Sequence, residues 1–449
     1  MTLRDQNKNN ISIQSLIDKI PGRDKGIDCA GLSGSEKGYL VAELYDKLGL
    51  PIVIVVSSQK EAGKFAEDLD FFFGNSNPPV ILFPSYNILP FKDVAYHNQT
   101  AASRISTLYR MIHYDIPPIV VTTPSALLQK IIPKKELGDF AELVMEGEEC
   151  DRDLLIKNLI AGGYTRSVIV EEPGDFCVRG GILDLFSPGY DDPVRIEWFG
   201  DIVESLRFFS AASQRKLKSI PEAVILPAGE VILKKESLES LFRRIREQAA
   251  SLDIPATVSR DIIDKIRNEG LFQGIERLAP IIYTELDTFF DYVPEKALFI
   301  LSEPDELKKS AEEFRELVSK NYLEASGEQK FCAAPETIYL EWAEAVKFFL
   351  DNNPVNLSML PVSNFELTQD EGSRPVVIKW ERWDFEIKDN ASMRPELKNF
   401  QDKDNLFLPL ADWIKDNKAA GNAVFIVCST KSQSDRLTFL LSPYGLRPA

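Results

Sequence analysis

The chain has little of several things that common kinds of site require. It contains two histidines among 449 residues, so a histidine-based metal centre or catalytic triad has almost no material. Its five cysteines are scattered and include no Cys-x-x-Cys pair, which argues against a zinc site or a disulfide framework and favours a reducing compartment. No apolar run approaches the roughly 20 residues of a membrane span, and the polar N-terminus lacks a signal-peptide core. We therefore expect a cytoplasmic protein that does not contact a membrane.

Positive charge is also scarce. The chain has 52 lysines and arginines against 69 aspartates and glutamates, which gives a net charge of −17. A protein that grips DNA by its phosphates normally carries a basic surface, and no cluster of lysine and arginine is visible here. The acidic balance favours a protein partner over nucleic acid. Weak DNA binding by the α/β core is kept as a less favoured hypothesis.

The first part of the chain, residues 1–137, alternates between short apolar runs and amphipathic segments. The runs suit buried parallel strands, and the amphipathic segments repeat their apolar residues at helical spacing. The expected strands are residues 52–56, 80–83 and 119–122, and the expected helices are 60–72 and 103–113. Strands and helices that alternate in this way predict a doubly wound parallel sheet.

The second part, residues 138–222, changes to shorter strands separated by turn residues, which predicts a small α+β domain inserted into the first. Val194, Ile196 and Trp198 alternate with Arg195 and Glu197. Alternation of this kind places the two charges on the opposite face of a sheet from the three apolar side chains. We therefore expect an antiparallel sheet with one buried face and one charged face.

A two-residue hairpin turn is predicted at Gly180-Gly181. Such a turn would pair Cys177 with Asp184 and place Phe176, Val178, Leu183 and Leu185 towards a core. Arg179, Asp184 and Phe186 would then face the other way, beside Arg195 and Glu197. On that face Phe186 would be an apolar anchor for a partner, although a place in the core is the alternative.

The remainder of the chain divides into three further segments. Residues 223–350 return to long helices, expected at 236–252 and 305–320, around a strand-like run at 298–301. Residues 351–380 are rich in Asn, Pro, Ser and charge, which predicts a linker. Residues 381–449 are expected to form a small α/β domain, with a strand at 424–428 between helices at 408–415 and 432–441. The sequence then stops without a visible natural ending, so we expect a piece of a longer protein.

The segment Gly31–Gly38, GLSGSEKG, approaches a phosphate-binding loop without completing it. Gly31 and Lys37 have the spacing of the G-x-x-x-x-G-K-[ST] motif. Glu36, however, replaces the second glycine and would put an anionic side chain where backbone N–H groups must approach a phosphate. Gly38 replaces the hydroxyl that binds Mg²⁺, and no apolar strand ends in Asp-Glu. We expect a degenerate loop that uses no nucleotide cofactor, with a weak non-catalytic anion site left open.

A long spaced pattern runs through the inserted segment. It consists of Tyr164 and Arg166, the stretch Phe176–Gly180, Asp184 and Phe186, and finally Arg195, Glu197, Phe199, Gly200 and Asp201. This pattern resembles the UvrA-binding domain that the excision-repair protein UvrB shares with Mfd, the family of transcription-repair coupling factors. The degenerate loop, and a tract at 80–104 too short for the DNA-gripping hairpin of UvrB, make the chain similar to the N-terminal region of Mfd.

The resemblance implies a fold, a partner and contact residues. Residues 223–350 would close a degenerate RecA-like, UvrB-like parallel sheet begun by residues 1–137. The inserted domain would bind UvrA through Arg166, Arg179, Arg195 and Glu197, while Cys177 replaces an arginine of some UvrB sequences. RNA polymerase, DNA, ATP and Mg²⁺ would engage domains of the parent protein whose motifs do not occur here, and a C-terminal domain would mask the UvrA-binding surface.

Other interpretations stay open on the residues alone. Arg166 would otherwise cap a helix or pair with Glu171, Arg179 would only solubilise the hairpin, and Arg195 and Glu197 would only pair with each other. An enzymatic function, a UvrB-like DNA-dependent ATPase with an unusual loop, is the alternative, and whether the chain is an enzyme is left uncertain. We expect a monomer without a metal site.

Overall fold

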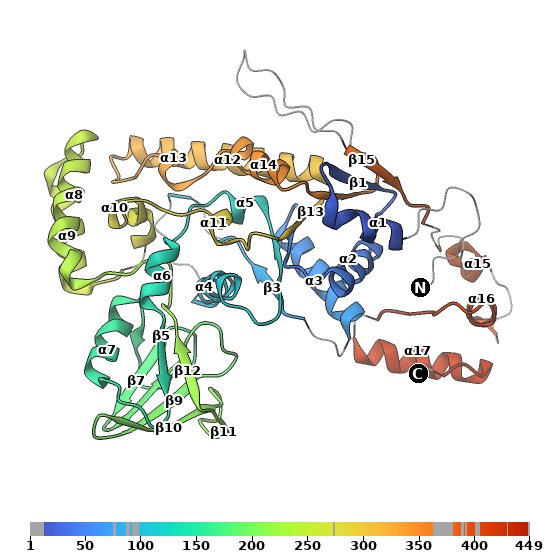
Figure 1. The fold of residues 1–449 in the computed structure, drawn as a ribbon, viewed down its shortest axis with the longest axis horizontal. Helices are drawn as coiled ribbons and strands as arrows, with labels where there is room; N and C mark the ends of the chain where they lie inside the picture. The colour runs from blue at the N-terminus through green and yellow to red at the C-terminus, as the bar shows by residue number, and fades with distance from the viewer. Residues whose placement is uncertain are drawn as a thin grey trace, which may run out of the picture. The chain divides into compact units, whose positions relative to one another are not determined.

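The computed structural model describes residues 13–74, 78–86, 90–91, 98–272, 274–361, 380–387, 390, 393–399, 405–428 and 430–447 (Figure 1). The chain forms two compact units, Pro21–Trp383 and a smaller one made of Met1–Ile20 with Asp384–Ala449. Among the helices in these described ranges, none combines the length and the apolar character needed to cross a bilayer.

A seven-stranded sheet is the centre of the larger unit. Its strand order is β15-β1-β14-β13-β2-β4-β3, and every neighbouring pair from β1 to β3 is parallel. The strands are β1 (Gly26–Ala30), β2 (Ile52–Val55), β3 (Val80–Phe83), β4 (Ile119–Thr122), β13 (Leu298–Ser302), β14 (Val355–Ser358) and β15 (Trp380–Asp384). All residues of β1, β2, β4, β13 and β14 are buried, which explains the apolar runs of β2 and β4.

This sheet confirms the predicted parallel α/β fold. β13 lies between β14 and β2, so segments far apart in the sequence share one sheet. The helices of this part are α2 (Glu36–Leu48), α3 (Gln59–Phe73), α4 (Asn98–Ile112), α5 (Pro124–Leu127), α11 (Phe289–Tyr292), α12 (Pro304–Gly327), α13 (Pro335–Ile338) and α14 (Trp342–Asp351). The expectation of a linker from residue 351 is wrong at β14, because Asn356 and Ser358 are polar yet fully inside the sheet and obscure the strand pattern.

A second, six-stranded sheet holds the inserted segment, in the order β11-β10-β9-β8-β7-β6. Its strands are β6 (Thr165–Arg166), β7 (Asp175–Arg179), β8 (Ile182–Leu185), β9 (Val194–Phe199), β10 (Ile202–Phe209) and β11 (Lys216–Ser219). All its pairings are antiparallel except β6 with β7. The β7–β8 register pairs Arg179 with Ile182 and Cys177 with Asp184, as the hairpin prediction required.

The inserted segment is entered and left through neighbouring strands. β5 (Glu142–Met145) pairs antiparallel with β12 (Glu222–Ile225), so the chain returns beside the point where it departed. Between them, α7 (Arg152–Ala161) covers one face of the six-stranded sheet (Figure 1). This arrangement supports an insertion over about the range that the sequence predicts.

The larger unit also contains a helical hairpin, α8 (Leu238–Ser251) and α9 (Ala256–Glu269) (Figure 1). The two helices lie side by side and have their own apolar core. Two further short helices of the larger unit are α6 (Lys134–Phe140) and α10 (Ala279–Ile282). α8 and α12 confirm the two long helices expected in this segment, and α12 extends further, to Gly327.

The smaller unit contains α1 (Ile13–Lys19), α15 (Met393–Asn399), α16 (Leu408–Ala419) and α17 (Lys431–Leu441). α16 and α17 confirm the expected helices. The expected strand at 424–428 is wrong, because residues 422–428 adopt no regular structure. Val427 is 80% exposed, and within the described part of this unit no strand lies beside the segment to accept its backbone hydrogen bonds.

Candidate functional site

The six-stranded sheet has one apolar face and one charged face, and β9 shows how the sequence produces both. Val194, Ile196 and Trp198 are buried in a core that includes Leu155 and Leu159 of α7. The residues between them point the other way, as the period of two in a strand requires. We call the side opposite α7 the charged face; its members are Cys177, Arg179, Asp184, Arg195, Glu197, Ser205 and Arg207.

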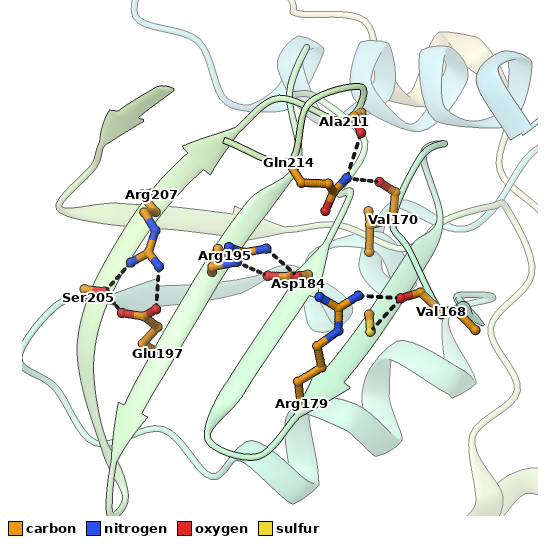
Figure 2. A network of polar contacts seen from close by, with 11 residues as sticks. Val168, Val170, Arg179, Asp184, Arg195, Glu197, Ser205, Arg207, Ala211 and Gln214 are labelled. Carbon is orange, nitrogen blue, oxygen red and sulfur yellow. Dashed lines mark hydrogen bonds and ion pairs between the residues drawn. The ribbon is translucent and has the colours of Figure 1, made fainter. Parts of the chain in front are cut away.

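Arg195 lies at the centre of the charged face and is engaged within it. Its Nε donates to Oδ1 of Asp184 at 2.5 Å, and its Nη2 donates to Oδ2 at 2.8 Å. The Asp184 side chain is only 2% exposed, and the Arg195 guanidinium lies 4.7 Å from the centre of the Phe209 ring. Donation to Asp184 raises the pKa of Arg195 above its ordinary value. This two-pronged pair holds β8 and β9 together (Figure 2).

Glu197 belongs to a second ion pair, with Arg207 of β10. Arg207 Nη2 donates to Glu197 Oε1, and Ser205 Oγ donates to Glu197 Oε2 at 2.9 Å (Figure 2). The hydrogen bond from Arg207, supported by that from Ser205, lowers the pKa of Glu197 from 4.5 to about 2. The predicted contact residue Glu197 is therefore held by a neighbouring strand.

Arg207 is a member of this face that sequence reasoning missed. A register shift between Val203 and Ser205 places Ser205 opposite Glu197, and Arg207 opposite Arg195. An unbroken hairpin would have placed Glu204 opposite Glu197, and like charges directly opposite each other are unfavourable. The sequence did contain a signal for this bulge. In a regular hairpin Glu204 would face Glu197, and a bulge separates the two carboxylates.

Arg179 ends β7 and is exposed, beside the turn at Gly180. Its Nη2 donates to the backbone oxygen of Val168 at 2.6 Å, and the Cys177 thiol approaches the same oxygen at 3.4 Å (Figure 2). Arg179 forms no ion pair within the described ranges of the chain. Its charge is therefore free to act on a partner while the side chain supports a neighbouring loop.

Phe186 does not have the exposed position that an anchor needs. It is 7% exposed and packs with Val170, Cys177 and Phe209. The loop above this cluster is fastened by Gln214, whose amide donates to the Ala211 oxygen at 2.7 Å and to the Val170 oxygen at 3.4 Å (Figure 2). The expectation of an apolar anchor is corrected to the alternative, a core residue, because the ring packs among Val170, Cys177 and Phe209.

Arg166 lies at the edge of the sheet, apart from the other predicted residues. It is exposed, and β6 places it opposite Phe176 in the register with β7. Phe176 faces the α7 core, so Arg166 leaves the sheet from that side and not from the charged face. The fold therefore brings Arg179, Arg195 and Glu197 together, with Arg166 around the adjacent edge.

The degenerate loop at Gly31–Gly38 is occupied by its own side chain. Glu36 Oε1 accepts hydrogen bonds from the backbone N–H groups of Ser33, at 2.5 Å, and Gly34, at 2.7 Å. Burial acts to raise the pKa of Glu36, yet these backbone donors hold it below its ordinary value. The carboxylate takes donors that a phosphate would need.

Lys37 and Gly38 also have internal roles. Lys37 is buried, and its Nζ lies 2.6 Å from Oε1 of Glu303 and 3.1 Å from Oγ of Ser302. A Cβ added to Gly38 would lie 3.0 Å from the Cβ of Asp68 on α3. The glycine therefore permits the close packing of α2 on α3, which a serine or threonine in this position would obstruct.

Comparison with known proteins identifies the inserted segment. Residues 143–230 match the family model described as the UvrB interaction domain. The chain is 30% identical over 426 residues to a transcription-repair-coupling factor of Myxococcus xanthus, an alignment that covers 92% of this chain and 34% of that protein. It is 29% identical over 288 residues to the transcription-repair-coupling factor of Escherichia coli, with 63% of this chain and 24% of that protein covered. The chain thus spans about a third or less of these relatives.

Proposed function

We propose that this chain, which corresponds to the N-terminal region of the transcription-repair coupling factors, recruits the excinuclease subunit UvrA and so links stalled transcription to nucleotide excision repair. The observation that carries the proposal is that the segment matched by the family model is the segment that forms the charged face. The residues that match the UvrB interaction domain, 143–230, are those that build the charged face. A domain shared with UvrB is expected to share its partner.

The chemistry of the face suits a protein partner. Arginine offers a planar set of donors to carboxylates and tolerates burial at an interface better than lysine does. The Asp184–Arg195 and Glu197–Arg207 pairs pre-organise the strands, so little side-chain order has to be imposed on binding. The net charge of −17 favours this interpretation over a DNA-binding face.

The enzymatic alternative has less support. A phosphate would have to displace the Glu36 carboxylate from the N–H groups of Ser33 and Gly34. It would also have to take Lys37 from Glu303. We propose that RNA polymerase, DNA and ATP are engaged by parts of the coupling factors outside this chain, and that the chain acts in the cytoplasm as a monomer.

A binding titration tests the proposal. Purified UvrA is titrated into the whole chain by isothermal calorimetry, beside Arg179→Glu and a matched charge reversal, Lys216→Glu. Lys216 is exposed on β11, at the opposite edge of the same sheet. We expect saturable binding that Arg179→Glu weakens and Lys216→Glu leaves nearly unchanged, with equal melting temperatures. A folded chain that does not bind UvrA would refute the proposal.

A further inference from the structure

The arginines of the inserted domain differ in how far their charge is neutralised. Arg195 is paired with Asp184, and Arg207 with Glu197. Arg166 and Arg179 form no ion pair with any described residue, and both are exposed. Arg166 and Arg179 therefore both keep an uncompensated charge, on β6 and β7, two neighbouring strands at one edge of the sheet.

Two apolar side chains are exposed in the loop that follows Arg166, whose backbone Arg179 contacts at Val168. Val168 is 84% exposed and Ile169 is 46% exposed, whereas the next residue, Val170, is 1% exposed. Covering two adjacent aliphatic side chains with a partner would be favourable, because it removes their apolar surface from water. We call Val168 and Ile169, together with Arg166 and Arg179, the edge patch.

The loop that carries the edge patch is held in place. The Val168 oxygen accepts from Arg179 at 2.6 Å, and Ser167 Oγ donates to Asp175 Oδ1 at 2.9 Å. The other oxygen of Asp175 accepts from the backbone N–H groups of Glu171 and Glu172, both at 3.1 Å. A loop fixed at both ends presents its apolar tip without the ordering cost of a flexible one.

We propose that the edge patch, and in particular the Val168–Ile169 tip, is the principal contact surface of the inserted domain. It fits a protein surface with an apolar recess bordered by carboxylates, because both cations of the patch lack acidic partners. The inference rests on the proposed function, and the partner surface that the edge patch contacts is therefore a surface of UvrA. Arg179 has two tasks here: it positions the tip through the Val168 oxygen, and its remaining donors face a partner carboxylate.

The centre of the charged face is a poor competitor for this role. Asp184 is 2% exposed, and both oxygens of its carboxylate are used by Arg195. A partner that claimed Arg195 would leave that carboxylate buried and unpaired. The centre therefore supports the edge patch rather than making the main contact.

The chain offers a closely matched control for the tip. Phe199 and Ile202 flank the β9–β10 turn and are 79% and 46% exposed, nearly the values of Val168 and Ile169. UvrA is titrated into the wild-type chain, into Val168→Ser/Ile169→Ser and into Phe199→Ser/Ile202→Ser. Both variants lose exposed apolar area without a change of charge.

We expect the tip variant to weaken UvrA binding about tenfold or more, and the turn variant to change it less than about twofold. Arg179→Met should weaken binding and also accelerate amide hydrogen exchange at residues 168–170, whereas Arg166→Met should weaken binding alone. Wild-type binding that the tip variant leaves intact, or that both double variants weaken equally, would overturn this inference while the proposed function stands. Absence of wild-type binding would overturn both.

Discussion

Asp184 and Arg195 face each other across β8 and β9 and are joined by two hydrogen bonds of 2.5 and 2.8 Å. Asp184 is almost completely buried, so its charge depends on the guanidinium for solvation. The residue that the sequence pattern marks as a partner contact is therefore first a structural one. Mutations at Arg195 are therefore expected to change the stability of the fold, and any effect on binding must be separated from that change.

Arg195→Met should destabilise the chain markedly, since it strands the buried Asp184 carboxylate; losses of about 3–5 kcal/mol are typical for a broken buried pair. Urea denaturation measures the change. Arg179→Met is the matched control, because the Arg179 side chain is exposed and bonds only a backbone oxygen. Asp184→Leu/Arg195→Met should recover much of the lost stability. Equal stability of the two single variants would contradict the structural role of the pair.

Phe186→Ala should destabilise the protein by about 3–5 kcal/mol, the usual cost of a large-to-small change at a buried aromatic residue. The reason is the cavity that it leaves between Val170, Cys177 and Phe209. Denaturant titration gives the stability, and calorimetry at a temperature where the variant is folded gives UvrA affinity. A stable variant with lost affinity would restore Phe186 as a direct contact.

Acid should weaken the fold partly through Glu197. Its carboxyl has a pKa of about 2 in the folded chain against 4.5 as the ordinary value. The unfolded chain therefore takes up this proton at higher pH, and the stabilisation, complete above pH 4.5, is lost as the pH falls towards 2. Glu197→Gln should show a shallower loss of stability over that window, measured by urea titrations at successive pH values. Glu204→Gln, an exposed carboxylate on the same hairpin, should follow the wild type.

The strand alternation and the turn residues were enough to predict the β7–β8 register and the two faces of β9, because both follow from a period of two and one glycine turn. They could not predict the partners of Arg195 and Glu197. Those depend on the bulge near Ser205, which is a property of two strands together. Likewise, the burial of Phe186 depends on Val170 and Phe209, which come from other segments and which no local pattern encodes.

The strand β14 shows the same limit in the larger sheet. Asn356 is fully buried. This polar residue lies within a strand because β1 and β13 pair with it on both sides. The strand expected at 424–428 shows the converse, an apolar run that lacks a neighbouring strand in the described part of its unit. Whether a segment becomes a strand thus depends on the neighbouring strands available to it, which its own residues do not encode.

Restoring the loop hydroxyl should harm the protein without creating a nucleotide site. Gly38→Ser would bring a Cβ to 3.0 Å from the Cβ of Asp68, and overpacking of this kind costs about 1–3 kcal/mol. Gly63→Ser is the control, because a Cβ added at Gly63 of α3 meets nothing within 4 Å. We expect Gly38→Ser alone to lower the melting temperature, and Mg·ATP to raise it in neither variant, since Glu36 still occupies the backbone donors of the loop. Differential scanning fluorimetry with and without Mg·ATP measures both effects. Micromolar Mg·ATP binding by the wild-type chain, abolished by Lys37→Ala, would instead favour the ATPase alternative.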